Sequence, residues 1–179
     1  MNIRRQSENH MISKRSRQYI GIVVAVVAYY IIHEGAHLMV ALLMGAFKQI
    51  NFIGLGIQID IYRELLTDTQ LGWFCLVGAL STFVVAWILV LMSRRICTSS
   101  SPVFKATMWY VTLALLLLDP LYLSVLYGFF GGGDMNGIRL LLPETAVRTG
   151  FAVIVGIHLL VIWKYLQPKY SESFQKHQI

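Results

Sequence analysis

The stretch HEGAH, residues 33–37, places two histidines and a glutamate inside a run of apolar residues. On an α-helix, His33 and His37 lie one turn apart, roughly 40° in azimuth and about 6 Å along the axis, so both imidazoles can reach one metal ion. Glu34 lies at the edge of the same face. In the pattern His-Glu-x-x-His, two neutral imidazoles bind zinc and the glutamate accepts the proton of an attacking water. We therefore predict His33 and His37 as metal ligands and Glu34 as the catalytic base.

Four apolar segments must position these residues. Of the 179 residues, 56% are hydrophobic and 13% charged, and the mean hydropathy is +0.62, which fits a polytopic membrane protein better than a water-soluble domain. Each segment is near or above the roughly 20 residues that cross a bilayer. The sequence therefore predicts an all-α membrane protein with about four transmembrane helices, near residues 19–47, 71–92, 106–130 and 150–166.

The basic residues predict how the chain is oriented. If the spans alternate, all but four of the fifteen Lys and Arg residues fall on the side that holds both termini. The positive-inside rule then places both termini in the cytoplasm of a multi-pass protein of the cell membrane. We expect a basic cytoplasmic tail over residues 1–18, a transmembrane domain over 19–166 and a second cytoplasmic tail over 167–179. Because the charge follows the membrane, we expect the lipid bilayer and no nucleic acid as its partner.

A polar contact between helices is the structural alternative to a metal site at residues 33–37. An acidic side chain at the middle of a membrane costs on the order of 3 kcal/mol on insertion scales. Two histidines in the same turn add to this cost and pack no better than leucine. The cluster therefore favours a metal site over a structural contact.

Catalytic zinc sites usually have three protein ligands, so a carboxylate from another segment should complete the set. Asp119 and Asp134 are the two candidates. Depth favours Asp119, because His33 and Asp119 each lie about fourteen residues, roughly 20 Å, from the same end of their spans. Context favours Asp134, because three preceding glycines could turn the chain back toward the site. The residues alone leave both open.

Other features of the sequence predict structure rather than chemistry. Residues 50–62, INFIGLGIQIDIY, alternate with a period of two, which predicts a strand or small hairpin near the outer membrane interface, with an irregular amphipathic loop as the alternative. Pro120 removes a backbone donor and predicts a kink in the third span. We expect the lone His158 to be structural. The two cysteines lack Cys-x-x-Cys spacing, so we assign them neither a disulfide nor a metal.

HEGAH in a spanning helix, followed by a β-like segment and then by an aspartate in a glycine-rich turn, resembles the site-2 protease-like intramembrane zinc metallopeptidases. The stretch GGGDMNGIRLLL is similar to the segment in which that family carries its aspartate ligand, usually written Leu-Asp-Gly. The resemblance implies a site-2 protease-like core over roughly residues 19–142. It maps the zinc ligands onto His33, His37 and Asp134 and the catalytic glutamate onto Glu34, with one Zn²⁺ per chain.

The sequence departs from the family's pattern at three places. The aspartate segment reads Gly-Asp-Met-Asn-Gly, the upstream Asn-x-x-Pro element is absent, and GALST, residues 78–82, stands where members often have Gly-Pro and an asparagine. With Asp134 as the ligand, Asp119 could orient His33 or His37 from behind, or contact substrate.

The implied activity is hydrolysis of peptide bonds in membrane-embedded or membrane-associated substrates, by a zinc metalloendopeptidase. The sequence leaves the substrate, the regulatory partners and the oligomeric state open. Two other classes of protein could use the same polar cluster: a metal-ion transporter, which would need a second ligand-rich helix, and a non-catalytic membrane scaffold. The intact glutamate favours the enzyme.

Overall fold

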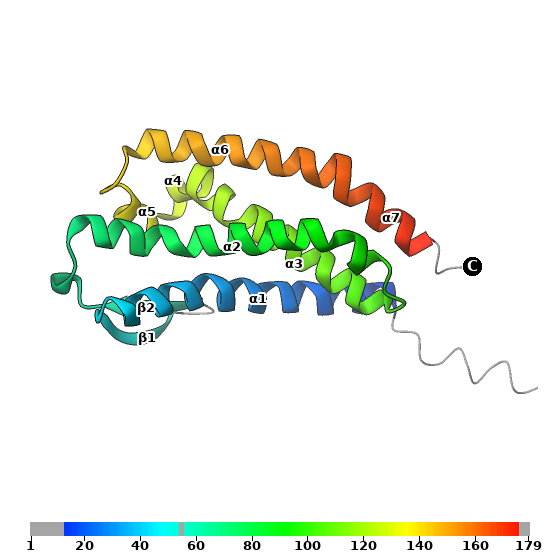
Figure 1. Cartoon of the computed structure of the whole chain (residues 1–179), viewed down its shortest axis with the longest axis horizontal. Helices are drawn as coiled ribbons and strands as arrows, with labels where there is room; N and C mark the ends of the chain where they lie inside the picture. Colours follow the sequence, from blue (N-terminus) through cyan, green and yellow to red (C-terminus); the bar gives the residue numbers. More distant parts are fainter. Residues whose placement is uncertain (1–12, 54–55, 176–179) are drawn as a thin grey trace, which may run out of the picture.

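The computed structural model describes residues 13–53 and 56–175, and long helices make up most of it (Figure 1). The helices are α1 (Lys14–Leu43), α2 (Asp68–Cys97), α3 (Pro102–Leu121), α4 (Tyr127–Phe130), α5 (Gly133–Ile138), α6 (Glu144–Val161) and α7 (Gln167–Gln175). Two π-helical segments, Tyr122–Leu126 and Ile162–Leu166, join α3 to α4 and α6 to α7. A hairpin of β1 (Phe47–Ile53) and β2 (Gly56–Ile61) and a short 3-10 turn (Arg63–Leu65) lie between α1 and α2.

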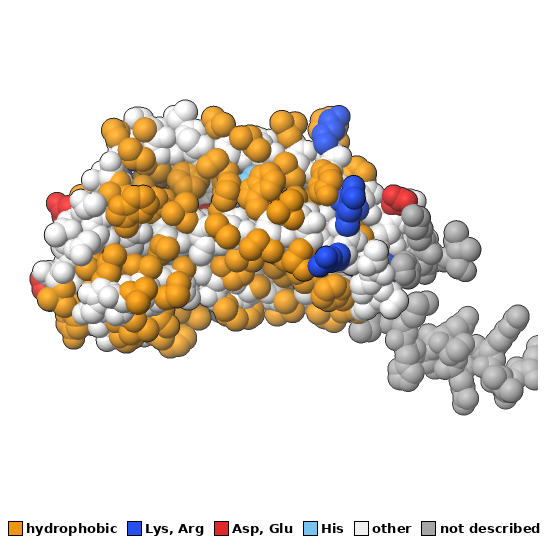
Figure 2. Space-filling model, in the orientation of Figure 1, with side chains coloured by type: hydrophobic (Ala, Val, Ile, Leu, Met, Phe, Trp, Pro, Cys, Tyr) orange, Lys and Arg blue, Asp and Glu red, His pale blue; other side chains and the backbone are white. Residues whose placement is uncertain are grey.

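Four continuous helices are long and apolar enough to cross a membrane, which confirms the predicted number of spans for the described part of the chain: Lys14–Leu43, Asp68–Cys97, Pro102–Phe129 and Glu144–Gln175. Figure 2 shows apolar side chains over the whole length of the bundle and Lys and Arg gathered at one end. These features indicate a multi-pass membrane protein. The start of α1 and the end of α7 lie at that same end of the bundle (Figure 1). That this end faces the cytoplasm stays a prediction.

The first helix is displaced toward the amino terminus relative to the predicted span. It begins at Lys14, because the Ser13 hydroxyl accepts a hydrogen bond from the Ser16 backbone N–H at 3.1 Å and caps the helix. It ends before Gly45, whose φ of +65° reverses the chain into β1. Residues 14–18 of the predicted tail are therefore helical, while residues 1–12 lie outside the described part.

The last helix extends further than the sequence predicted, through Pro168 to Gln175. The π-helical segment before Pro168 accommodates the missing proline N–H. The continuation, α7, packs against the other helices: Tyr170 is 3% exposed, and Lys105 Nζ of α3 donates to the Ser173 carbonyl at 2.9 Å. Most of the predicted second tail is therefore a packed helix, and residues 176–179 lie outside the described part.

Just after Pro120, where the sequence predicted a kink, α3 gives way to the π-helical segment. Without a proline N–H, the Leu116 carbonyl has no donor one turn later in its own helix. His158 of α6 fills that role, because its Nδ1 lies 2.6 Å from the Leu116 oxygen, while its Nε2 accepts from Trp87 Nε1 at 3.3 Å. His158 thus has a structural role, binding α6 to the irregular part of α3.

The predicted β-like segment is an antiparallel hairpin, with Phe47 opposite Ile61 and Ile53 opposite Gly56. It begins three residues earlier than the alternation indicated, and residues 54–55 lie outside the described part. The hairpin and α5 both lie at the end of the bundle opposite to α7 (Figure 1). The chain thus brings a strand, a short helix and the distal half of α1 to one place.

Candidate metal centre

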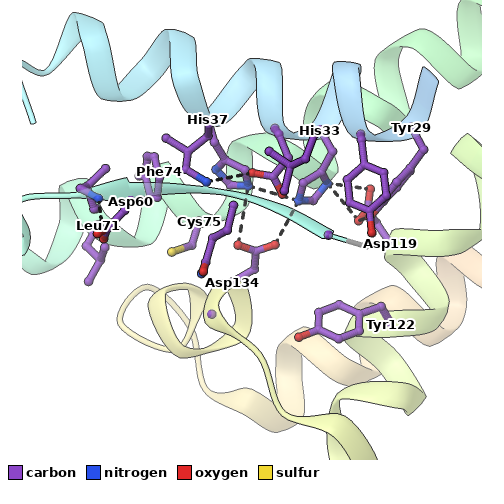
Figure 3. A pocket seen from close by; sticks show the side chains of 18 residues that line it. Tyr29, His33, His37, Asp60, Leu71, Phe74, Cys75, Asp119, Tyr122 and Asp134 are labelled. Atoms are coloured by element: carbon purple, nitrogen blue, oxygen red, sulfur yellow. Dashed lines mark hydrogen bonds and ion pairs between the residues drawn. The ribbon is translucent and has the colours of Figure 1, made fainter. Parts of the chain in front are cut away.

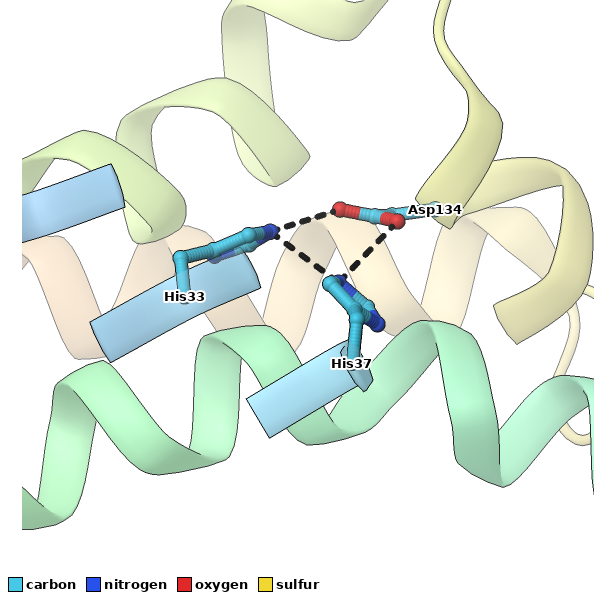
Figure 4. Close-up of side chains that lie close together, drawn as sticks. All are labelled: His33, His37 and Asp134. Carbon is cyan, nitrogen blue, oxygen red and sulfur yellow. Dashed lines mark hydrogen bonds and ion pairs between the residues drawn. The ribbon is translucent and has the colours of Figure 1, made fainter. Parts of the chain in front are cut away.

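Two histidines of α1 face the interior of the bundle. His33 and His37 are 5% and 3% exposed, and their ring centroids are 4.9 Å apart. Their Nε2 atoms approach to 3.2 Å (Figure 4). Spacing by four residues on a helix gives this proximity, as predicted from the motif.

The structure brings Asp134, and not Asp119, to the same two Nε2 atoms. Asp134 Oδ2 lies 3.1 Å from His33 Nε2, and Oδ1 lies 3.6 Å from His37 Nε2 (Figure 4). One ligand atom from each of the three residues falls within 4.8 Å of the others. They form a triangle of two nitrogens and one carboxylate.

The glycines before Asp134 are required by the path of the chain. Gly131 and Gly132 have φ of +66° and +148°, which other residues rarely adopt. A Cβ at Gly132 would stand 1.4 Å from the hydroxyl of Tyr122, which donates to the Gly131 carbonyl at 2.6 Å. The tight turn therefore carries α5, and Asp134 with it, back toward α1.

The separations within this cluster are close to those expected around a tetrahedral metal ion such as zinc. Bonds of roughly 2.0–2.2 Å at tetrahedral angles put neighbouring ligand atoms about 3.3–3.5 Å apart. The two Nε2 atoms are 3.2 Å apart, and each lies near a different oxygen of Asp134: Oδ2 is 3.1 Å from His33 Nε2, and Oδ1 is 3.6 Å from His37 Nε2. Two imidazoles and one carboxylate are also a common donor set of catalytic zinc sites, with the fourth position left open.

Gly78 of α2 lies against the Nε2 side of the two imidazoles. A Cβ built there would lie 2.5 Å from His37 Nε2 and 2.7 Å from His33 Nε2. An alanine at this position would thus occupy the space in front of both ligand atoms. The stretch GALST contains this glycine, but nothing in the sequence marked it as part of the site.

Asp119 lies on the other side of His33. Its Oδ1 and Oδ2 are 3.2 and 3.3 Å from His33 Nδ1. It also accepts hydrogen bonds from Tyr29, at 2.5 Å, and from Thr82, and only 2% of its surface is exposed. A carboxylate on Nδ1 fixes the tautomer that leaves Nε2 free to bind a metal. Asp119 is therefore placed as an orienting residue, one of the two roles considered for it.

The two histidines and Asp134 line a cavity of about 500 Å³, with walls from α1, α2, α3, β2 and α5 (Figure 3), and Glu34 lines it too. Its Oε2 accepts a hydrogen bond from the Ile59 backbone N–H at 3.3 Å. The N–H of Ile59 therefore points away from β1. By alternation, the same edge of β2 presents the backbone groups of Ile57 and Ile61, of which the Ile61 N–H donates to Asp60 Oδ1 at 3.0 Å.

The cavity has apolar walls as well as polar ones. Leu71, Phe74 and Cys75 of α2 line it on one side. The Phe74 ring packs against His37, with centroids 4.8 Å apart. Gly137 of α5 abuts Cys75, because a Cβ there would stand 2.2 Å from the sulfur. This contact seats α5 on α2 and fixes the depth of Asp134.

Comparison with protein-family models, with curated proteins and with solved structures found no match for this chain.

Proposed function

We propose that this protein is a zinc-dependent endopeptidase that cleaves peptide bonds of membrane-embedded or membrane-associated substrates. The observation that carries the proposal is the meeting of His33, His37 and Asp134 beside Glu34 in one cavity. Two imidazoles and a carboxylate direct ligand atoms at one place, with a second carboxylate beside them, which is the set of groups that a catalytic zinc site uses. The site-2 protease-like core stays part of this proposal.

The residues would act in distinct roles. His33, His37 and Asp134 would hold the zinc ion, which when bound would supply a water of lowered pKa and polarise the substrate carbonyl. Glu34 accepts the proton of the attacking water and passes it to the leaving amine. Asp119 holds His33 in the tautomer that presents Nε2 to the metal.

The open edge of β2 is a place where a substrate could bind in extended form. A peptide bond within a helix is shielded by its own hydrogen bonds, so a membrane-embedded substrate must unwind before attack. The sheet has only two strands in the described residues, and its β2 edge borders the cavity beside Glu34. An unwound segment could pair with this edge and be held with a carbonyl near Glu34.

A first experiment tests this function in purified protein reconstituted in liposomes. The probe is a synthetic fluorogenic peptide of about 20 apolar residues, the length of one span, with a Gly-Pro pair at its centre. Wild type should cleave it, 1,10-phenanthroline should stop cleavage, and added zinc should restore it. Glu34→Gln should keep its zinc and lose turnover, since it removes only the base.

The same liposomes separate the enzyme from its rivals. Zinc uptake measured with an entrapped zinc-sensitive dye, together with no cleavage, would favour a transporter and contradict the proposal. Cleavage that survives in Glu34→Gln would contradict the assigned role of the glutamate. Zinc binding with neither cleavage nor transport, for this probe and for a peptide mixture, would favour a scaffold.

A further inference from the structure

A second cavity lies at the opposite end of the bundle from the metal centre, among α1, α3 and α7. Its volume is about 320 Å³. Two of the residues that line it are cationic and three are aromatic, and the full set is Lys14, Arg17, Gln18, Ala106, Trp109, Tyr110, Ser171 and Phe174. None of the residues that line this cavity has a role in the proposed hydrolysis, so the cavity needs its own explanation.

Close packing of α1 on α3 forms the floor of this cavity. A Cβ at Gly21 would stand 2.5 Å from the Tyr110 ring and 3.3 Å from the Ala106 carbonyl. Arg17 lies one helical turn before Gly21, so the close approach brings its side chain over the same part of α3. The cation is half-buried as a result.

The α7 side of the cavity is held firmly in place. Lys105 Nζ donates to the Ser173 carbonyl and hydroxyl at 2.9 and 3.0 Å, and lies 5.2 Å from the centre of the Phe174 ring. Trp109 packs against Tyr170, with ring centroids 5.0 Å apart. The aromatic walls are therefore fixed by contacts within the protein.

The charge of the cavity is positive. The ion pairs among the described residues include neither Lys14 nor Arg17. Glu172 is the one carboxylate that α7 carries, and it does not line the cavity. Two cations beside Trp and Tyr side chains, which favour membrane interfaces, form a setting suited to a phosphate group.

An apolar surface leads away from this cavity along α1. Ile20 and Val24 follow Arg17 at spacings of three and seven residues, on the same face, and each is 39% exposed. An acyl chain could lie along this stripe while its headgroup occupies the cavity. A soluble phosphate would use the cations but not the stripe.

From this arrangement we propose that the cavity between α1, α3 and α7 binds the phosphate headgroup of an anionic phospholipid, through Lys14 and Arg17. The site is independent of the proposed peptidase activity. Its ligand would link the amino-terminal part of α1, the helix that carries His33 and His37, to α7.

The test measures the Tm of the full chain in detergent while phosphatidylglycerol is titrated in. Wild type should show a saturable increase that phosphatidylcholine does not produce. Lys14→Gln/Arg17→Gln should weaken the apparent affinity about 30-fold, as expected for two cations near an anionic headgroup. The control Arg15→Gln/Arg95→Gln removes the same charge at the same end of the bundle without touching the cavity, and should bind as wild type does.

Glycerol 3-phosphate, titrated in parallel, distinguishes the sources of phosphate. Saturable stabilisation by this soluble compound, lost in Lys14→Gln/Arg17→Gln, would support the phosphate site and contradict the lipid as its source. Equal loss of phosphatidylglycerol binding in Lys14→Gln/Arg17→Gln and in the control Arg15→Gln/Arg95→Gln would overturn the site. The loss would then follow from total charge and not from the cavity. Native mass spectrometry tests the proposal on wild type alone. If wild type retained phosphatidylglycerol and phosphatidylcholine in equal amounts from an equimolar mixture, the proposal would also be overturned.

Discussion

Asp119 and Asp134 contact opposite nitrogens of one imidazole ring, that of His33. Asp119 Oδ1 lies 3.2 Å from Nδ1, and Asp134 Oδ2 lies 3.1 Å from Nε2. The two aspartates therefore divide two roles that the sequence left open between them. Asp119 holds the His33 ring in place. Asp134 and His33 Nε2 face the position where a metal would bind.

Asp119→Asn should weaken zinc binding without abolishing it. The amide keeps the size of the carboxylate but lowers the basicity of His33, and the loss of such a partner typically costs 10- to 100-fold in affinity. Competition with a chromophoric zinc chelator measures this change. Unchanged affinity, in a variant with unchanged Tm, would contradict the orienting role.

Gly78→Ala should block the metal site while leaving the helix intact. The new methyl group would stand where the two Nε2 atoms converge, so we expect loss of zinc and of cleavage. Alanine itself favours a helix over glycine by about 1 kcal/mol. Gly156→Ala is the matched control, because a Cβ at Gly156 of α6 has no atom within 4 Å. Full zinc binding by Gly78→Ala would place the metal elsewhere.

The contact between His158 and the Leu116 carbonyl should contribute to stability and not to chemistry. His158→Phe removes the donor and leaves a buried carbonyl unpaired, which should cost about 1–3 kcal/mol of unfolding free energy. Pro120→Ala restores a backbone N–H one turn after Leu116, so the double variant should recover part of the loss. A double-mutant cycle based on denaturation measures the coupling. Additive effects would contradict the account of His158.

The open edge of β2 should matter for cleavage but not for zinc. Ile57→Pro removes a backbone N–H on the edge that borders the cavity, so cleavage should fall while zinc binding persists. Phe52→Pro is the control: Phe52 pairs with Ile57, and because the Ile59 N–H points away from β1, the Phe52 N–H faces the outer edge of β1. Equal activity in the two variants would contradict pairing of substrate with β2.

The sequence predicted most of the candidate site because its signals are local. The spacing of His33 and His37 depends only on helix geometry, and apolar length alone predicted four spans. Local signals could not choose between Asp119 and Asp134. Depth along the third span favoured Asp119, whereas the glycines favoured Asp134. The turn decided it: Gly132 packs against Tyr122 and directs α5 toward α1.

Other parts of the structure depend on contacts between helices that the sequence does not reveal. Gly78 is one glycine among fourteen, and its importance comes only from the two imidazoles packed against it. The helix beyond Pro168 was missed because proline usually ends a helix, whereas a π-helical segment and the contact of Ser173 with Lys105 let it continue. In each case the deciding partner is distant in the chain.

The proposed function depends on His33, His37 and Asp134 holding one zinc ion. The most direct measurement is zinc per chain in detergent-purified protein, by elemental mass spectrometry after dialysis against limiting zinc. Asp119→Asn and Asp134→Asn are measured beside wild type. We predict one zinc in wild type, little in Asp134→Asn and a reduced but clear amount in Asp119→Asn. No zinc in wild type after reconstitution, or full zinc in Asp134→Asn, would contradict the account.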